Sequence, residues 1–322
     1  MPYSFLRTGS SDMARAKQPK LIPQMTVREW ETAFPDEDAC DAYLVAHRWP
    51  DGVHCPRCGS TKVYALATRK WHWECPDCRQ GGAYRFSDIA GTIFENTKVD
   101  LRQWFRVIHL MLTSKKGMSA LQIYRYMGFG SYRTAWYMCQ RVRAALQDAE
   151  FKKLMGIVEL DETFVGGKAK NRHKDKRGGG KGHGGTPKVA VVGAVSRSKK
   201  TVVARVIGEA SLNAIFGFVS HTVDPKVSIL ATDQWKGYRA FDREFTRHSV
   251  DHSAGEYVRE EELVGAIHTN TIEGFWSLLK RGIIGNYHKV SKKYLPLYVA
   301  EFCFRYNNRE NTDIFGTAIA GC

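Results

Sequence analysis

Four cysteines near the start of the chain have the spacing of a metal site. They form two C-x2-C pairs separated by sixteen residues, Cys55 with Cys58 and Cys75 with Cys78. Each C-P-x-C turn presents two thiolates, so two such turns complete the tetrahedron that Zn²⁺ prefers. Because sulfur fills all four positions, no vacancy remains for water or substrate, and we expect the Zn²⁺ to be structural.

The segment between the two pairs, KVYALATRKWHWE, predicts two short strands around a turn, which would join the pairs in a zinc ribbon. Two disulfides or an iron site are the alternatives. A basic chain without an apolar secretory segment favours a reducing compartment, which argues against the disulfides. We expect Cys40, Cys139 and Cys303, which lack partner spacing, to be small buried hydrophobic residues.

Three carboxylates later in the chain suggest a second kind of metal site. Asp161 ends the apolar run of LMGIVELD, and Asp233 ends that of ILATD. If these runs are neighbouring strands of one sheet, their ends bring both carboxylates to one edge, where the oxygen ligands suit Mg²⁺ or Mn²⁺. Glu273, near the start of TNTIEGFWSLLKR, would supply a third ligand. Taken singly, each could instead be an ordinary turn or cap residue.

The segment that contains Glu273 has the pattern of an amphipathic helix. Thr269 or Asn270 can cap it, and an apolar stripe would hold it against the sheet. Lys280 lies seven residues beyond Glu273, about two turns, and therefore shares its face. We expect Lys280 to contact a DNA phosphate, with Arg281 as the alternative contact.

The elements that would carry the two aspartates follow a simple order. β-Branched runs and one helical pattern predict strand, strand, strand, helix and strand in LMGIVELDETFVGG, KVAVVGAVSR, TVVARVIGEA, SLNAIFGFVSHTV and SILATDQWKGY.

The segment before these strands is helical. Apolar residues at helical spacing predict three helices in residues 96–150, and MGFGS separates the second from the third as in a helix-turn-helix. A plain helical domain is the alternative. Five side chains of the third helix could face phosphates or base edges: Tyr132, Arg133, Gln140, Arg141 and Arg143.

The charge of the chain points to an acidic polymer as partner. Lys and Arg number 48 against 33 Asp and Glu, a formal charge of +15. Most of the excess lies in two stretches, from Asp100 to Gln147 and from Lys168 to Lys188, each with eight basic residues against one acidic residue. Neutralising phosphates releases counterions, so double-stranded DNA is the expected partner. The glycine-rich loop 166–188, with Lys174, Lys176 and Arg177, is either a solvated linker or a phosphate clamp, which we favour.

The order Asp161, Asp233, Asn270-x-x-Glu273 stands within LDETFVGGK, TDQWKGY, HTNTIEGFWSLLKRGIIGNYH and EFCFRYNNR. From about residue 25 to the C-terminus the chain resembles the DDE transposases of bacterial insertion sequences, specifically the family numbered fifteen ninety-five, the ISXO-two type. The resemblance implies a multidomain α/β chain in which a zinc ribbon precedes a ribonuclease-H-like catalytic domain. It also implies that Asp161, Asp233 and Glu273 bind the catalytic metal and that Asn270 is their companion.

The activity implied is binding of terminal inverted repeats, cleavage with water and joining of the freed 3′ hydroxyl to target DNA. Two Mg²⁺ or Mn²⁺ ions about 3.5 to 4 Å apart can promote both phosphoryl transfers. We expect at least a homodimer on DNA, since two element ends are held together. A nuclease without strand joining and a catalytically silent DNA-binding regulator are the rivals. No apolar run is long enough for a membrane span, so the expected location is the bacterial cytoplasm, at the nucleoid when on DNA.

The expected organisation is therefore sequential. It consists of a disordered N-terminus, a zinc-ribbon region, a helix-turn-helix segment, the catalytic domain and a C-terminal tail, at residues 1–24, 25–95, 96–150, 154–310 and 311–322.

Overall fold

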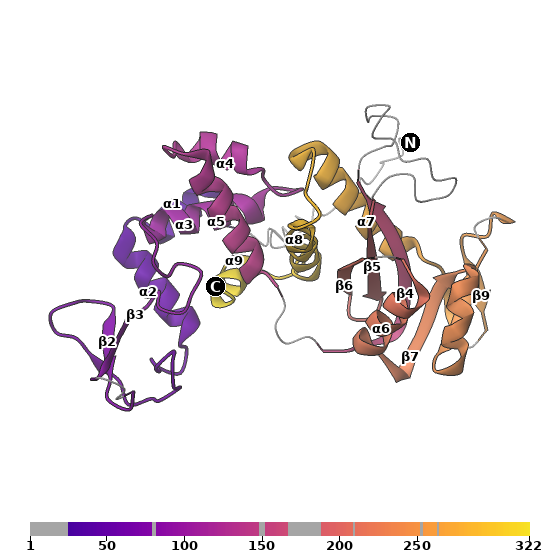
Figure 1. Cartoon of the computed structure of the whole chain (residues 1–322), viewed down its shortest axis with the longest axis horizontal. Helices are drawn as coiled ribbons and strands as arrows, with labels where there is room; N and C mark the ends of the chain where they lie inside the picture. The colour runs from indigo at the N-terminus through magenta and orange to yellow at the C-terminus, as the bar shows by residue number, and fades with distance from the viewer. Residues whose placement is uncertain are drawn as a thin grey trace, which may run out of the picture.

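The computed structural model describes residues 25–78, 82–147, 152–166, 188–208, 210–251, 254–262 and 264–322. Figure 1 shows two parts side by side, one made of helices and a small ribbon, the other of a larger sheet with its own helices. The predicted N-terminal segment 1–24 and nearly all of the basic loop, including Lys174, Lys176 and Arg177, lie outside the described residues.

The ribbon is an antiparallel sheet of three short strands in the order β1-β2-β3. The strands are β1 (Tyr64–Ala65), β2 (His72–Cys75) and β3 (Tyr84–Ser87). The predicted hairpin is present as β1 and β2, whereas β3 was not predicted. A small core of its own, which includes Trp49, Phe86 and two of the four cysteines, supports the ribbon.

Two helices precede the ribbon, in a region that we expected to belong to it. They are α1 (Val27–Ala33), which begins with a capping box between Thr26 and Glu29, and α2 (Glu37–Arg48), capped by Asp36. Most of their buried apolar side chains pack away from the ribbon, although Val45 of α2 packs against the ribbon core. Trp30, Phe34 and Leu44 are part of a helical core with residues of α3 (Leu101–Thr113).

The three predicted helices are α3, α4 (Ala120–Met127) and α5 (Tyr132–Ala145). Gly128 ends α4 at φ 64°, a left-handed conformation that glycine adopts without a steric penalty. The Ser131 side chain then accepts a hydrogen bond from the Arg133 amide and caps α5. The turn of a helix-turn-helix is therefore built as the sequence predicts.

The last helix, α9 (Ile314–Ala320), completes the same helical core. The Phe315 ring lies 5.5 Å from that of Phe34 and 5.6 Å from that of Phe105, measured between centroids. The segment expected as a C-terminal tail is thus a packed helix, which lies among the N-terminal helices (Figure 1).

The larger sheet has five strands in the order β6-β5-β4-β7-β8. The strands are β4 (Leu154–Val165), β5 (Val189–Ser196), β6 (Thr201–Ile207), β7 (Val223–Asp233) and β8 (Thr246–Val250). The first three pair antiparallel, while β4, β7 and β8 run parallel to one another. The predicted order of strands and helix is confirmed, and the strands that carry Asp161 and Asp233 are neighbours.

Helices cover both faces of this sheet. One face packs against α6 (Leu212–Thr222) and the short helix η3 (Lys236–Arg243), and the other against α7 (Asn270–Gly282) and α8 (Leu295–Asn307). Because side chains alternate along a strand, the even-numbered residues of β4 face α6 and the odd-numbered ones face α7. The hairpin of β9 (Arg259–Glu261) and β10 (Gly265–Ile267) leads into α7, and η5 (Ile283–Tyr287) follows it.

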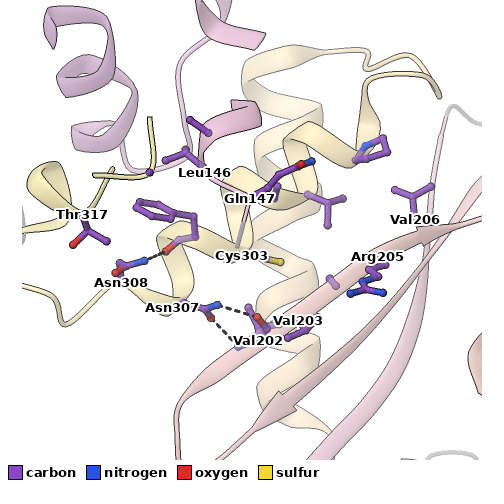
Figure 2. A pocket seen from close by; sticks show the side chains of 17 residues that line it. Leu146, Gln147, Val202, Val203, Arg205, Val206, Cys303, Asn307, Asn308 and Thr317 are labelled. Atoms are coloured by element: carbon purple, nitrogen blue, oxygen red, sulfur yellow. Dashed lines mark hydrogen bonds between the residues drawn. The ribbon is translucent and has the colours of Figure 1, made fainter. Parts of the chain in front are cut away.

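A cavity of about 800 Å³ lies between α8, β6 and the end of α5 (Figure 2). None of the candidate catalytic carboxylates lines it. The Asn307 side chain accepts a hydrogen bond from the Val202 amide and donates one to its carbonyl, at 2.8 and 3.0 Å. This pairing, together with α8, covers the edge strand β6 against association with another strand.

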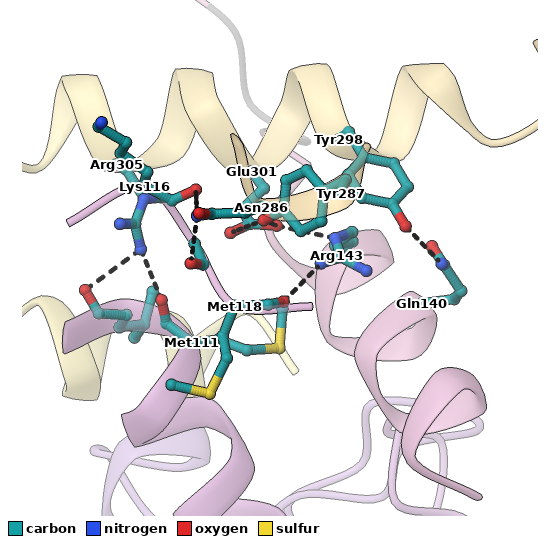
Figure 3. A network of polar contacts seen from close by, with 12 residues as sticks. Met111, Lys116, Met118, Gln140, Arg143, Asn286, Tyr287, Tyr298, Glu301 and Arg305 are labelled. Carbon is teal, nitrogen blue, oxygen red and sulfur yellow. Dashed lines mark hydrogen bonds and ion pairs between the residues drawn. The ribbon is translucent and has the colours of Figure 1, made fainter. Parts of the chain in front are cut away.

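The two parts of the molecule are joined by a buried polar network (Figure 3). Arg143 of α5 donates to Glu301 of α8 at 2.7 Å, and both side chains are essentially inaccessible to solvent. The Tyr287 hydroxyl lies 3.3 Å from both Glu301 oxygens, and the Arg143 guanidinium lies 4.0 Å from the ring centroid of Tyr298. The helix-turn-helix is therefore fixed to a helix that covers the larger sheet.

None of the helices in the described ranges is both long and apolar enough to span a membrane.

Candidate metal centres and nucleic-acid interface

The four predicted cysteines converge. All four sulfur atoms lie within 4.8 Å of one another, with Cys55 Sγ 3.8 Å from Cys78 Sγ and Cys58 Sγ 3.7 Å from Cys75 Sγ. Four sulfurs at about 2.3 Å from a central Zn²⁺ would be about 3.8 Å apart along each tetrahedral edge. The spacing of these sulfur atoms therefore fits Zn²⁺ with four thiolate ligands.

Asp161 and Asp233 lie at the same level of the larger sheet. The last parallel pair of β4 and β7 joins Glu159 to Ala231, and each aspartate is two residues further along its strand. Paired residues of neighbouring strands point to the same face, and so do residues two apart, so both carboxylates face α7. The adjacency expected from the sequence is observed, but only Asp233 ends its strand, because β4 continues beyond Asp161 to Val165.

The surroundings of Asp161 are built by a tryptophan and a glycine. Trp276 of α7 donates from its indole nitrogen to Asp161 Oδ2 at 3.0 Å. Gly193 pairs with Asp161 across β5, and a Cβ there would lie 2.7 Å from the Trp276 ring. A glycine is needed at this position because the indole lies directly over the strand.

The pKa of Asp161 is raised to about 7, first by burial and then by the neighbouring carboxylates of Glu162 and Asp233. Both causes disfavour the ionised form, whereas an adjacent cation would favour it. Two partly buried carboxylates on one face form a hard oxygen donor set, which fits Mg²⁺ or Mn²⁺. Glu162 itself points to the other face, where it accepts a hydrogen bond from the Tyr238 hydroxyl.

Glu273 is an exposed residue of the first turn of α7, the helix that packs over this face. Its Oε1 accepts a hydrogen bond from the Thr269 hydroxyl at 3.0 Å. Within the described residues, only the four cysteines form a group of three or more ligand side chains within 4.8 Å of one another. Asp161, Asp233 and Glu273 thus share a face without forming so tight a cluster. Asn270 is exposed at the first position of α7.

Thr269 is the N-cap residue of α7, as one of the two residues predicted, but its hydroxyl donates to the Glu273 side chain and the cap of the helix amides is a tertiary contact. Glu159 of β4 accepts hydrogen bonds from the amides of Thr271 and Ile272 at 2.8 and 2.9 Å. The sequence analysis missed Glu159, although its position two residues before Asp161 places it on the same face.

The basic residues proposed from the sequence have different environments. Lys280 and Arg281 are exposed in the last turn of α7, and Arg133 is exposed in the first turn of α5. Arg141 is half-buried and donates to the Glu95 and Thr92 carbonyls at 3.3 and 3.4 Å.

The expected DNA contacts of Arg143 and Gln140 are corrected by their burial. Arg143 is 0% exposed and paired with Glu301, so its guanidinium cannot reach a phosphate. Gln140 is 7% exposed, with Nε2 3.3 Å from the Tyr298 hydroxyl oxygen. Both lie on the side of α5 that packs against α8. The exposed side instead presents Tyr132, Arg133 and Tyr137.

Comparisons with known proteins agree with this arrangement. Residues 35–88 match the transposase zinc-ribbon domain, and residues 153–307 match the ISXO2-like transposase domain. The chain is 29% identical over 286 residues to an uncharacterized protein in transposable element ISH50 of Halobacterium salinarum, across 84% of this chain and 91% of the relative.

A chain in the structure of the simian T-cell lymphotropic virus intasome with PP2A regulatory subunit B56 gamma is 11% identical. The superimposed region spans 56% of this chain and 67% of the viral-complex chain. Its TM-score of 0.26 is too low to inform the fold.

A zinc ribbon ahead of a mixed α/β sheet that carries Asp161 and Asp233 on one face, together with these matches, defines a transposase class. The family predicted from the sequence motifs is thus matched by two domains of this chain, the transposase zinc ribbon and the ISXO2-like transposase domain.

Proposed function

We propose that the chain is a DNA transposase that binds the terminal inverted repeats of its element and catalyses metal-dependent cleavage and strand transfer. The observation that supports this most strongly is the placement of Asp161 and Asp233 at one level of adjacent parallel strands, under the helix that carries Glu273. These three carboxylates would hold Mg²⁺ or Mn²⁺, with Asn270 beside them.

The reaction consists of two in-line phosphoryl transfers. In cleavage, a water oxygen attacks phosphorus, the bond to the 3′ oxygen breaks, and that oxygen leaves as a free hydroxyl. In strand transfer, this 3′ hydroxyl oxygen attacks a target phosphorus and displaces the target's own 3′ oxygen. A bound divalent cation would supply Lewis-acid polarisation of the reacting oxygens. The indole of Trp276 would keep Asp161 Oδ2 occupied and so fix the orientation of that carboxylate.

The exposed basic residues would bind the DNA. In the helix-turn-helix, Arg133 and the half-buried Arg141 would face the DNA. In α7, Lys280 and Arg281 would contact phosphates near the cut. We include Lys174, Lys176 and Arg177 in this surface on charge alone. Two element ends must be held together for transposition, so we propose a homodimer or larger assembly on DNA, acting in the cytoplasm.

The test uses a labelled, pre-cleaved element end and target DNA with Mg²⁺. Asp161→Asn, Asp233→Asn and Glu273→Gln should each reduce strand transfer by at least about 10³-fold while binding of the end is retained. Glu310→Gln is the matched control, because Glu310 is an exposed carboxylate that pairs with Lys200 away from the site.

Three outcomes would separate the rival functions. Cleaved but unjoined products from the wild type would indicate a nuclease. Specific binding without any cleavage in Mg²⁺ or Mn²⁺ would indicate a regulator. A substituted carboxylate that leaves strand transfer at the wild-type rate would remove that residue from the site.

A further inference from the structure

Glu159 is a buried carboxylate that has no part in the proposed reaction. Both of its oxygens accept hydrogen bonds from protein donors. Its side chain is 0% exposed. Oε2 accepts from the amides of Thr271 and Ile272, and Oε1 accepts from the Thr271 hydroxyl at 2.7 Å. One carboxylate thus satisfies two of the amides that the start of α7 leaves without partners inside the helix.

Arg197 completes the same arrangement. Its Nε donates to Glu159 Oε1 at 2.6 Å, and its terminal nitrogens donate to the carbonyls of Ala266 and His268, the latter at 2.7 Å. The Arg197 amide also donates to the Ile157 carbonyl of β4 at 3.0 Å. The guanidinium therefore ties the segment that enters α7 to the strand that carries Asp161.

These contacts link the two elements that the proposed catalytic site must align. Glu159 lies two residues before Asp161 on β4, and the amides that it binds lie one and two residues before Glu273 on α7. Within α7 itself, the N-cap residue Thr269 donates from its hydroxyl to Glu273 Oε1. Glu159 and Arg197 therefore hold the start of this helix to β4 from outside the helix.

We propose that Glu159, held by Arg197, is a positioning residue that fixes Glu273 of α7 opposite Asp161 and Asp233. This inference rests on the proposed function for the role of Glu273. Glu159 is not itself a metal ligand, because protein donors already engage both of its oxygens. It acts through the geometry of α7, and its loss should have the same consequence for metal binding as the loss of Glu273.

The experiment measures Mn²⁺ binding to the full-length, zinc-loaded protein by electron paramagnetic resonance. Glu159→Gln keeps the shape of the side chain but loses the charge and one acceptor. We expect it to lower Mn²⁺ affinity by about 10-fold or more, as for other groups that orient ligands. Glu273→Gln should give a similar loss, and the double variant should lose no more than Glu273→Gln alone.

Two further variants separate positioning from general stability. Glu37→Gln is the matched control, because Glu37 caps α3 in the same way, through the amides of Leu101 and Arg102, in the other part of the molecule. It should leave Mn²⁺ affinity unchanged. Thr271→Val removes only the hydroxyl contact with Glu159 and should produce a smaller loss than Glu159→Gln, which keeps the test valid if Glu159→Gln folds poorly.

The outcomes distinguish this inference from the proposed function. Wild-type Mn²⁺ affinity in Glu159→Gln, with a loss in Glu273→Gln, would show that Glu159 is merely structural. Losses that add in the double variant would also overturn the inference. If Glu273→Gln binds Mn²⁺ normally, the proposed ligand set fails. Hydrogen exchange of the Thr271 and Ile272 amides then decides whether Glu159 holds α7, since unchanged exchange in Glu159→Gln would exclude it.

Discussion

At the scale of single residues, three carboxylates within four positions of β4 have three different environments. Glu159 is engaged by donors of α7, Asp161 faces the same helix with a raised pKa, and Glu162 points to the opposite face toward Tyr238. Strand alternation separates Glu162 from the other two, and burial separates Glu159 from Asp161. The sequence motif predicts a metal-binding role for Asp161, whereas the roles of its neighbours depend on what packs against each face.

The close approach of Trp276 to β5 predicts a specific effect at Gly193. In Gly193→Ala the new Cβ would lie 2.7 to 2.8 Å from the buried indole, which has little room to move. We expect a loss of about 1–3 kcal/mol in the free energy of unfolding, typical of overpacking, together with displacement of the indole from Asp161. Urea unfolding of the zinc-loaded protein measures it.

Gly274→Ala is the control for this substitution. Apart from the neighbouring backbone of its own helix, no atom of the described residues lies within 4 Å of a Cβ at Gly274, which belongs to the same helix as Trp276. Alanine is favoured over glycine inside a helix by up to about 1 kcal/mol, so this variant should be at least as stable as the wild type. Equal stability of Gly193→Ala and the wild type would contradict the packing of Trp276 against β5.

At the scale of elements, the ribbon and the helical part have separate cores. The residues that support the four cysteines form a small cluster of their own, distinct from the core shared by α1 to α5 and α9. Binding of Zn²⁺ by four thiolates supplies folding free energy to a unit too small to be stable otherwise. The ribbon should therefore depend on the metal while the helical core does not.

Removal of Zn²⁺ tests this separation. Chelation, or Cys75→Ser, should abolish protection from hydrogen exchange in residues 53–78 and leave the amides of α3 and α5 protected. Elemental analysis should give one zinc per chain in the wild type. Full zinc content in Cys75→Ser, or loss of protection throughout α3, would contradict the assignment of a separate structural site.

The sequence predicts those elements whose pattern is local. The hairpin β1–β2, the three helices α3 to α5 and the order of β4, β5, β6, α6 and β7 follow from spacing and turns. In contrast, α1 and α9 have only seven residues each, and the apolar residues of α1, α2 and α9 meet through tertiary contacts, as Phe34 meets Phe315. The sequence also does not predict the cap of α7 by Glu159 or the burial of Arg143, because in each case the partner is more than a hundred residues away along the chain.

At the scale of the whole molecule, the chain crosses between its two parts more than once. After the larger sheet, α8 packs on β6 and against α5, and α9 then returns to the helical core. Asn286 donates to the Lys116 and Gly117 carbonyls, and Arg305 donates to that of Met111, so the loop before α4 is also held (Figure 3). The helix-turn-helix thus lies at a fixed distance from the proposed catalytic face.

Because the Arg143–Glu301 pair at this junction is buried, we expect the loss of one partner to lower the free energy of unfolding strongly. In Arg143→Met, Glu301 would remain buried without its cation, and the Tyr287 hydroxyl would still contact it. We expect a loss of about 3–5 kcal/mol in the free energy of unfolding. In Arg143→Met combined with Glu301→Leu no charge remains to be desolvated, so most of that loss should be recovered. Urea unfolding of both variants measures the difference.

Lys200→Met, which breaks the exposed pair with Glu310, is the control and should lower the free energy of unfolding by no more than about 1 kcal/mol. If Arg143→Met were as mild as Lys200→Met, the buried network could not be what holds the helix-turn-helix to α8, and the fixed distance would have to come from α9 and the loop contacts instead.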